Sequence, residues 1–272
     1  MSTTNPIVGV FDSGFGGLTV LRALLPKISA AHYIYLGDTA RLPYGAKSQQ
    51  TIARYAVESA RFLEARGCEY LVIACNTATA LALDDIRAAV SIPVLGVIEP
   101  GAESAYEATG HNSEILVLAT SATVQSHAYL RACTARGLRV TETACPLLVP
   151  LVEEGWIDHL VTREVLRIYH SEALHNCAPE AVLLGCTHYP LIAKAIGQTL
   201  ADLGSEATVI DSAEATAAAA SYALTSPRNP PDVFIPATFE CFATDSVEKF
   251  QRLGSLFLEQ PIEHVHLLDL GG

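Results

Sequence analysis

The sequence predicts an α/β protein with largely parallel sheets, and three observations support that fold class. Short runs rich in Val, Ile and Leu alternate with segments of helical length, which is typical of parallel strands covered on both faces. The chain has 272 residues, of which half are apolar and only 17% charged, so it can bury a substantial core. Similar motifs also recur at nearly equal spacing, which indicates two related halves.

The elements follow from these runs in chain order. The expected strands are Ile7–Phe11, His32–Leu36, Tyr70–Ala74, Val94–Val97, Glu114–Ala119, Ala181–Leu184 and Thr208–Ile210. The expected helices are Ser48–Arg66, Thr79–Val90, Gln125–Arg136 and Asp158–His175. The alanine-rich stretch 213–220 favours another helix, and the proline-rich stretch 226–231 favours a loop before a last strand and helix.

The recurring motifs suggest where a ligand binds. Cys75 and Cys186 lie 111 residues apart, and Ser13 and Ser121 lie 108 residues apart, each just after an expected strand. Open α/β sheets bind ligands beyond the carboxyl ends of their strands. We therefore expect two similar halves that face each other, with strand-end residues of both around one cleft.

Composition excludes several classes of protein. The net charge is −12 without a block of Lys or Arg, which argues against a nucleic-acid or anionic membrane surface. The apolar runs are too short to cross a bilayer, and the first residues do not resemble a secretory signal. We expect a cytoplasmic protein whose seven cysteines, without a CxxC pair, are reduced thiols and form neither a disulfide framework nor a zinc ribbon.

Two of the cysteines have a setting that favours chemistry. Cys75 and Cys186 each stand where an apolar strand ends and a helix is expected to begin. Unsatisfied N–H groups and the helix dipole lower the pKa of a thiol at such a position, which suits it to be a base or nucleophile. The other five are expected to be small buried apolar residues: Cys68, Cys133, Cys145, Cys177 and Cys241.

Polar residues near these joints are further candidates. Asp12, in FDSGFGGL, either caps the helix that follows or meets a substrate ammonium or a catalytic proton. His188 stands two residues beyond Cys186, close enough to exchange a proton with that thiol. The loop DTARLPYG, residues 38–45, offers backbone N–H groups to an anion or is an ordinary turn. Glu153 and Glu154 are expected at a solvated helix start unless their loop reaches the cleft.

Several motifs in fixed order resemble the glutamate racemases of the cofactor-independent aspartate/glutamate racemase family. They are GVFDSGFGGL, DTARLPYG, ACNTATA, VLGVIEPGA, LGCTHYP and FATDSVEKF, and they run from about residue 7 to residue 250. The resemblance implies an isomerase that interconverts L- and D-glutamate for peptidoglycan synthesis. It also implies a homodimer, no cofactor and no metal, with two domains: a discontinuous one of residues 1–98 with 210–272, and a second of residues 99–209.

The resemblance also implies roles for individual residues. Cys75 and Cys186 match the two catalytic cysteines of the family. Asp12 matches the residue that assists the first thiol, and His188 matches the residue that assists the second. Glu153 or its neighbour Glu154 matches a further assisting carboxylate. Positions that hold the substrate's ammonium and carboxylates are matched by Ser13, Pro43, Tyr44, Gly45, Asn76, Thr77, Thr120, Thr123 and Thr187. Two thiols on opposite faces of Cα suit inversion, because one removes a proton while the other delivers one.

Three other hypotheses fit part of the pattern. A racemase for another acidic amino acid, chiefly aspartate, uses the same two thiols. A cysteine hydrolase uses Cys186 with His188 and needs only one essential cysteine. A metal-binding protein takes Cys75, Cys186 and His188 as ligands.

Overall fold

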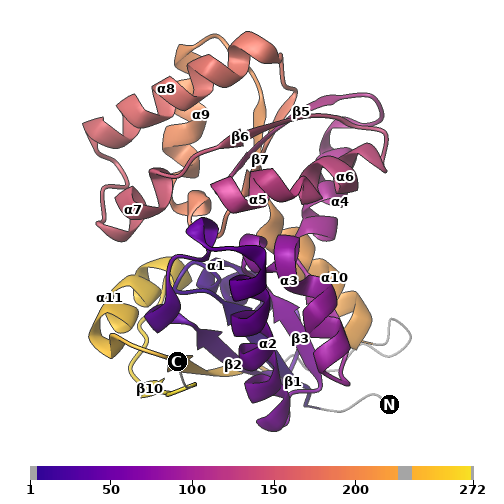
Figure 1. Ribbon diagram of the computed structural model, residues 1–272, viewed down its shortest axis with the longest axis vertical. Helices are drawn as coiled ribbons and strands as arrows, with labels where there is room; N and C mark the ends of the chain where they lie inside the picture. Colours follow the sequence, from indigo (N-terminus) through magenta and orange to yellow (C-terminus); the bar gives the residue numbers. More distant parts are fainter. Residues whose placement is uncertain (1–4, 226–234, 271–272) are drawn as a thin grey trace.

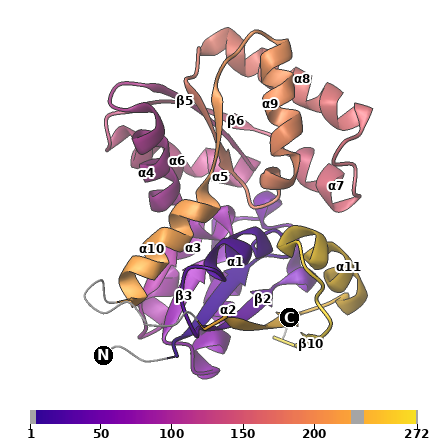
Figure 2. The ribbon, with the colours of Figure 1, turned by 180° about the vertical axis from the view of Figure 1, so that it is seen from behind.

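The computed structural model describes residues 5–225 and 235–270, and the expected loop at 226–231 lies outside them. Two lobes stand one above the other, each with a parallel sheet between helices (Figures 1 and 2). The predicted α/β class with parallel sheets is therefore confirmed.

The two sheets share one strand order. The lower sheet runs β10 (Val265–Leu267), β9 (Thr238–Ala243), β2 (His32–Gly37), β1 (Ile7–Asp12), β3 (Tyr70–Ile73) and β4 (Val94–Gly96). The upper sheet runs β6 (Arg139–Ala144), β5 (Glu114–Ala119), β7 (Ala181–Gly185) and β8 (Thr208–Asp211). The order β2-β1-β3-β4 thus recurs as β6-β5-β7-β8, so β3 and β7 occupy equivalent places. The internal repeat inferred from the cysteine spacing has this structural basis.

Helices cover both sheets. Those of the lower lobe are α1 (Leu18–Leu24), α2 (Gln49–Ala65), α3 (Asn76–Ala89) and α11 (Val247–Leu258). Those of the upper lobe are α5 (Ser121–Ser126), α6 (Ala128–Thr134), α7 (Leu148–Glu153), α8 (Leu160–Asn176) and α9 (Ala193–Asp202). The chain passes between the lobes through α4 (Ile98–Thr109) and α10 (Ser212–Leu224), which pack against each other. Both views place α7 above α11 on the side away from α4 and α10.

Side-chain burial explains these elements. In β1, Val8 and Val10 are fully buried in one apolar cluster and Phe11 in another, because successive side chains point to opposite faces of the sheet. At the start of α2, the Ser48 side chain accepts a hydrogen bond from the Thr51 backbone N–H at 3.4 Å. This cap satisfies one of the donors that a helix start leaves free, and so it fixes where the helix begins.

The structure corrects some expected elements. The single helix expected over 125–136 is instead two short helices, because His127 adopts a left-handed conformation (φ 52°) between α5 and α6. Strands β6 and β10 were not expected. The strand β6 is only half-buried, so polar residues interrupt its apolar pattern, and β10 has three residues.

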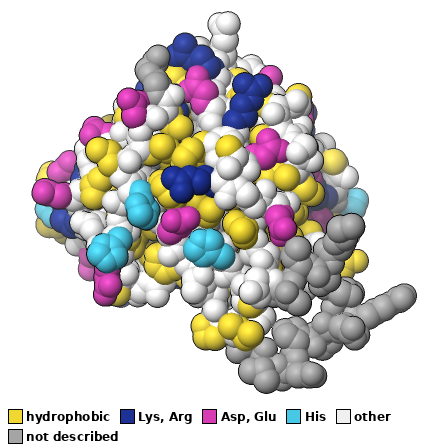
Figure 3. Space-filling model, turned by 90° about the horizontal axis from the view of Figure 1, so that it is seen from below, with side chains coloured by type: hydrophobic (Ala, Val, Ile, Leu, Met, Phe, Trp, Pro, Cys, Tyr) yellow, Lys and Arg dark blue, Asp and Glu magenta, His cyan; other side chains and the backbone are white. Residues whose placement is uncertain are grey.

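The face drawn in Figure 3 has, among its described residues, no continuous basic patch of the kind that binds an anionic partner. There, basic, acidic and apolar side chains are interspersed over the lower lobe (Figure 3). Across the described ranges, none of the helices has the length and apolar character needed to cross a bilayer.

Candidate active site

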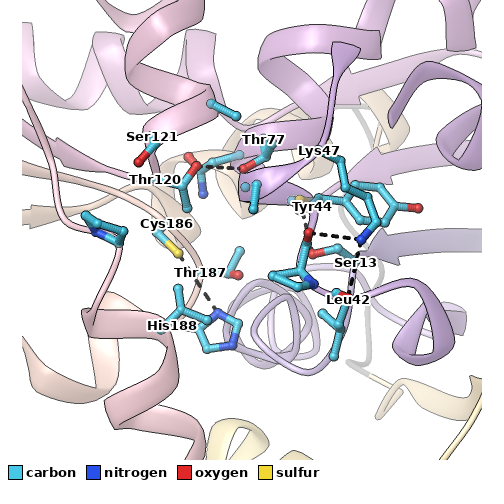
Figure 4. Close-up of a pocket in the computed structure, with 18 of the residues that line it drawn as sticks. Ser13, Leu42, Tyr44, Lys47, Thr77, Thr120, Ser121, Cys186, Thr187 and His188 are labelled. Carbon is cyan, nitrogen blue, oxygen red and sulfur yellow. Dashed lines mark hydrogen bonds between the residues drawn. The ribbon is translucent and has the colours of Figure 1, made fainter. Parts of the chain in front are cut away.

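A cavity of about 600 Å³ lies between the two lobes, at the carboxyl ends of the central strands. Ser13, Tyr44 and Cys75 reach it from the lower lobe. Thr120 and Cys186 reach it from the upper lobe (Figure 4). This arrangement is the cleft that the two-half hypothesis predicts.

The Cys75 thiol follows β3 and caps the start of α3. Its Sγ accepts a hydrogen bond from the Ala78 backbone N–H at 3.4 Å and donates one to Ser13 Oγ at 3.5 Å. Burial, reinforced by the charge of Asp12, nevertheless raises the pKa of Cys75 to about 11. The expected helix joint is present, but the expected lowering of the pKa is wrong because desolvation outweighs the helix terminus.

The Cys186 thiol occupies the equivalent place after β7. A short 3-10 helix (Tyr189–Ile192) follows it, where an α-helix was expected, and α9 begins only after that. The Sγ atom of Cys186 lies 4.0 Å from Nδ1 of His188, and Figure 4 shows it pointing toward that ring. Burial raises the pKa of Cys186 well above its usual range, and the charges of Cys75 and Asp12 add to this effect.

The His188 imidazole is held on its other side by a carboxylate. Its Nε2 lies 3.3 Å from Oε1 of Glu153, whose Oε2 accepts a hydrogen bond from Nζ of Lys249 at 3.0 Å. Burial alone would raise the pKa of Glu153, but His188 and Lys249 together hold it below its ordinary value. Glu153 is the last residue of α7 and not at a helix start, and it lines the cavity, so the alternative that this segment reaches the cleft is confirmed. A carboxylate can only accept, so the hydrogen in this bond belongs to Nε2 and Nδ1 faces the thiol.

The Asp12 carboxylate lies beneath the cavity wall and is fully buried. It accepts hydrogen bonds from the Gly14 backbone N–H at 2.8 Å and from Thr187 Oγ1 at 3.4 Å. Burial raises the pKa of Asp12, and the charge of His188 and these hydrogen bonds offset only part of the rise. Asp12 therefore binds the backbone of the loop before α1, and its part in proton transfer stays a prediction.

Hydroxyl groups join the two lobes near the thiols. Thr77 Oγ1, at the start of α3, lies 3.0 Å from Thr120 Oγ1 and 3.1 Å from Thr123 Oγ1 of the upper lobe. Beside them, Tyr129 donates a hydrogen bond to the Asn76 side-chain oxygen at 2.5 Å, which fixes the orientation of that amide. These groups form a polar wall that can donate hydrogen bonds to carboxylates.

Two glycines let the lobes approach closely. A Cβ placed on Gly16 would lie 2.2 Å from Thr187 Oγ1 and 2.7 Å from His188 Nδ1. A Cβ on Gly45 would lie 2.9 Å from Cβ of Thr120. The glycine-rich loop after β1 and the PYG loop therefore serve the packing of one lobe on the other.

The cavity brings together most of the residues expected at the site. All of them line it except Asp12 and Thr123, which lie directly behind the lining. The lining also includes residues that the sequence did not single out for the site: Leu42, Ala46, Lys47, Ser121, Ala122, Gln125, Pro146, Val149 and Pro150. The internal repeat, in which Ser121 corresponds to Ser13, could have predicted that Ser121 lines the cavity. In the part of the chain that the structure describes, His, Cys, Asp and Glu form no group of three placed to hold a metal ion.

Comparisons with known proteins find similar sequences and similar structures. A family model described as Asp/Glu/Hydantoin racemase matches residues 9–220. A glutamate racemase of Koribacter versatilis is 47% identical, and the alignment covers the full length of both chains. The crystal structure of Francisella tularensis glutamate racemase in complex with D-glutamate has a TM-score of 0.86 at 33% identity, covering 98% of each chain. A glutamate racemase isoform of Bacillus anthracis has a TM-score of 0.87 at 36% identity, covering 97% of this chain and 98% of its own.

Proposed function

Because this chain belongs to the Asp/Glu/hydantoin racemase family, we propose that it interconverts L- and D-glutamate by two-base proton transfer at Cα. The observation that carries the mechanism is the pair of thiols. Cys75 and Cys186 come from equivalent strand ends of two related sheets and line one cavity. Two groups that can each hold or release one proton, on opposite walls, are what inversion of a carbon centre requires.

The reaction consists of two proton transfers. One cysteine, as the thiolate, removes the Cα proton and leaves its electron pair on the substrate as a carbanion delocalised into the α-carboxylate. The other cysteine, as the thiol, delivers its proton to the opposite face of Cα. The two cysteines end with their protonation states exchanged, so each serves as base in one direction and acid in the other.

The walls of the cavity stabilise the charged species. Hydrogen bonds from backbone N–H groups and from hydroxyls such as that of Thr77 stabilise the charge that develops on the α-carboxylate. Burial raises the pKa of both thiols, so a thiolate needs a nearby cation. The ammonium group of the substrate is such a cation, and it favours the thiolate only while the substrate is bound.

Each thiol has its own partner. Asp12 lies close enough to Cys75 for its charge to raise the pKa of that thiol. His188 turns Nδ1 toward Cys186, with Glu153 behind it. These partners exchange protons with the thiols, which restores the starting protonation states between turnovers.

The contact between Cys186 and His188 also fits a cysteine hydrolase, the second candidate function. That function leaves the buried Cys75 without a role, whereas racemisation uses both thiols. The same scaffold also suits a racemase for aspartate, which a test of substrates distinguishes.

The first experiment is proton NMR with L-glutamate in D₂O, without pyridoxal phosphate, while optical rotation is followed. We expect the Cα–H signal and the rotation to be lost together. If glutamate shows no exchange and aspartate does, the substrate assignment is wrong. Exchange with neither amino acid would favour the hydrolase.

The two thiols make a separable prediction. Cys75→Ala and Cys186→Ala should each lower racemisation by about 10²–10⁴-fold or more, because a proton donor or acceptor is removed. Each variant should still eliminate the leaving group from a 3-chloroglutamate of one handedness, with the two variants opposite in preference. Near-normal racemisation by both variants would disprove the two-base mechanism.

We also propose that the protein forms a homodimer and supplies D-glutamate for peptidoglycan, as the resemblance implies. Large apolar side chains are exposed on and just before α8, namely Trp156, Leu160, Val161 and Ile168. Such a concentration is typical of an interaction surface. Light scattering should give twice the chain mass of 28.9 kDa, and Ile168→Glu should reduce it toward the monomer.

A further inference from the structure

The helix α11 belongs to the lower lobe, yet it contacts the imidazole of the upper lobe's His188 and the carboxylate behind it. Its Phe257 lies edge-on to His188, with ring centroids 5.2 Å apart and an interplanar angle of 77°. Two turns earlier, Lys249 donates a hydrogen bond to Glu153 at 3.0 Å. Lys249, Leu253 and Phe257 recur every four residues, so one face of α11 is turned toward this corner of the cleft.

Lys249 has a defined place in this corner. Its Nζ lies 5.4 Å from the ring centroid of Phe15, and its side chain is 39% exposed, whereas that of Glu153 is only 15% exposed. Among the described residues, Glu153 forms ion pairs with His188 and Lys249, and Glu154 is its neighbour in the chain. Lys249 therefore supplies a positive charge from the opposite lobe to a largely buried carboxylate.

We propose that Lys249 is a positioning residue for the Cys186 half of the site. By holding Oε2 of Glu153, it directs Oε1 to the Nε2–H of His188, so that Nδ1 faces the Cys186 thiol. This inference rests on the proposed racemisation and deepens it. Removing a partner that fixes the orientation and tautomer of a histidine typically lowers the activity of the site by about 10-fold or more.

The decisive variant is Lys249→Gln, compared with Lys249→Arg, which keeps a cation that can donate to Glu153. Arg252→Gln is the matched control, because Arg252 is an exposed cation on the same helix. The rates of elimination from the two enantiomers of 3-chloroglutamate measure the activity of each thiol as a base separately. The variants Cys75→Ala and Cys186→Ala identify which enantiomer each thiol attacks.

We expect Lys249→Gln to slow elimination from the enantiomer that Cys186 attacks by about 10-fold or more, and to leave the other within about twofold. Lys249→Arg should restore most of the rate, and Arg252→Gln should match the wild type. In a Glu153→Gln background, Lys249→Gln should have no further effect. Equal losses with both enantiomers would mean that Lys249 only helps to close the cleft, and no loss would also overturn the proposal.

A readout without substrate separates this proposal from the proposed function. In proton NMR, the buried Nε2–H of His188 should give a downfield signal that is assigned by its loss in His188→Gln. That signal should persist in Lys249→Arg and broaden in Lys249→Gln. An unchanged signal in Lys249→Gln refutes the positioning role, whether or not the wild type racemises glutamate.

Discussion

At the scale of single residues, Asp12 is a fully buried carboxylate directly behind the lining of the cavity. Burial raises the pKa of Asp12, and Thr187 of the other lobe donates a hydrogen bond to it. A carboxyl group with a raised pKa takes and releases a proton nearer to neutral pH than an exposed one does. The charge of Asp12 in turn raises the pKa of the neighbouring thiol, Cys75.

Asp12→Asn should therefore lower turnover more than it weakens binding. Asn keeps the shape and can still accept from the Gly14 N–H, but it cannot exchange a proton. We expect kcat to fall by about 10²-fold, with KM changed only a few-fold, in steady-state racemisation from both enantiomers. A rise in KM at constant kcat would instead make Asp12 a binding residue.

At the scale of secondary-structure elements, α8 carries a buried titratable group far from the chemistry. The side chain of His170 is fully buried, and within the described residues neither ring nitrogen has a hydrogen-bond partner. Burial lowers the pKa of His170 to about 4. The unfolded chain takes up this proton near pH 6.5, so it binds more protons than the native state between these two values, and stability falls as the pH falls through that window.

His170→Leu should remove this acid sensitivity. The wild type should lose about 2 kcal/mol of unfolding free energy from this one group between pH 7.5 and pH 5, and the variant should not. Melting temperatures measured at both pH values test the difference. His175→Gln, an exposed position on the same helix, should behave as the wild type. If His170→Leu kept the full acid loss, other groups would be responsible.

The elements also show what the sequence could and could not predict. Strands β1 and β3 could be predicted from the sequence because nearly all of their residues are apolar and buried, with Asp12 at the end of β1 as the exception. The break at His127 was not, because a left-handed residue other than glycine leaves no mark in an apolar pattern. The strand ends predicted Cys75 and Cys186 at the cleft, whereas Lys249 comes from a helix whose place beside α7 depends on the whole fold.

At the scale of the whole molecule, the lobes meet so closely that only glycine fits at some of their contacts. Gly16 lies against Thr187 and His188 across the cleft, and there is no room for a Cβ between them. Any added atom must displace His188 or separate the lobes, because both neighbours are buried.

Gly16→Ala should consequently impair racemisation while the protein remains folded. We expect kcat/KM to fall by about 10- to 100-fold, since misplacing reacting groups by about 1 Å can cost about 10²-fold. Gly67→Ala is a useful comparison for the loss of a glycine, since a Cβ there meets nothing within 4 Å, although its φ of 88° adds strain. Full activity of Gly16→Ala would show that the lobes work farther apart than in this structure.

The chain enters the upper lobe through α4 and returns through α10, and this route has a consequence for biosynthesis. The strands of the upper sheet follow one another without interruption, whereas β9 and β10 of the lower sheet are synthesised after all of them. During translation, the upper lobe can fold while the edge of β2 that later pairs with β9 is still open. Such an edge is a template for aggregation, so the nascent protein is most vulnerable in this interval. The helix α11 emerges between these last two strands, and the corner of the cleft around His188 is therefore completed late in synthesis.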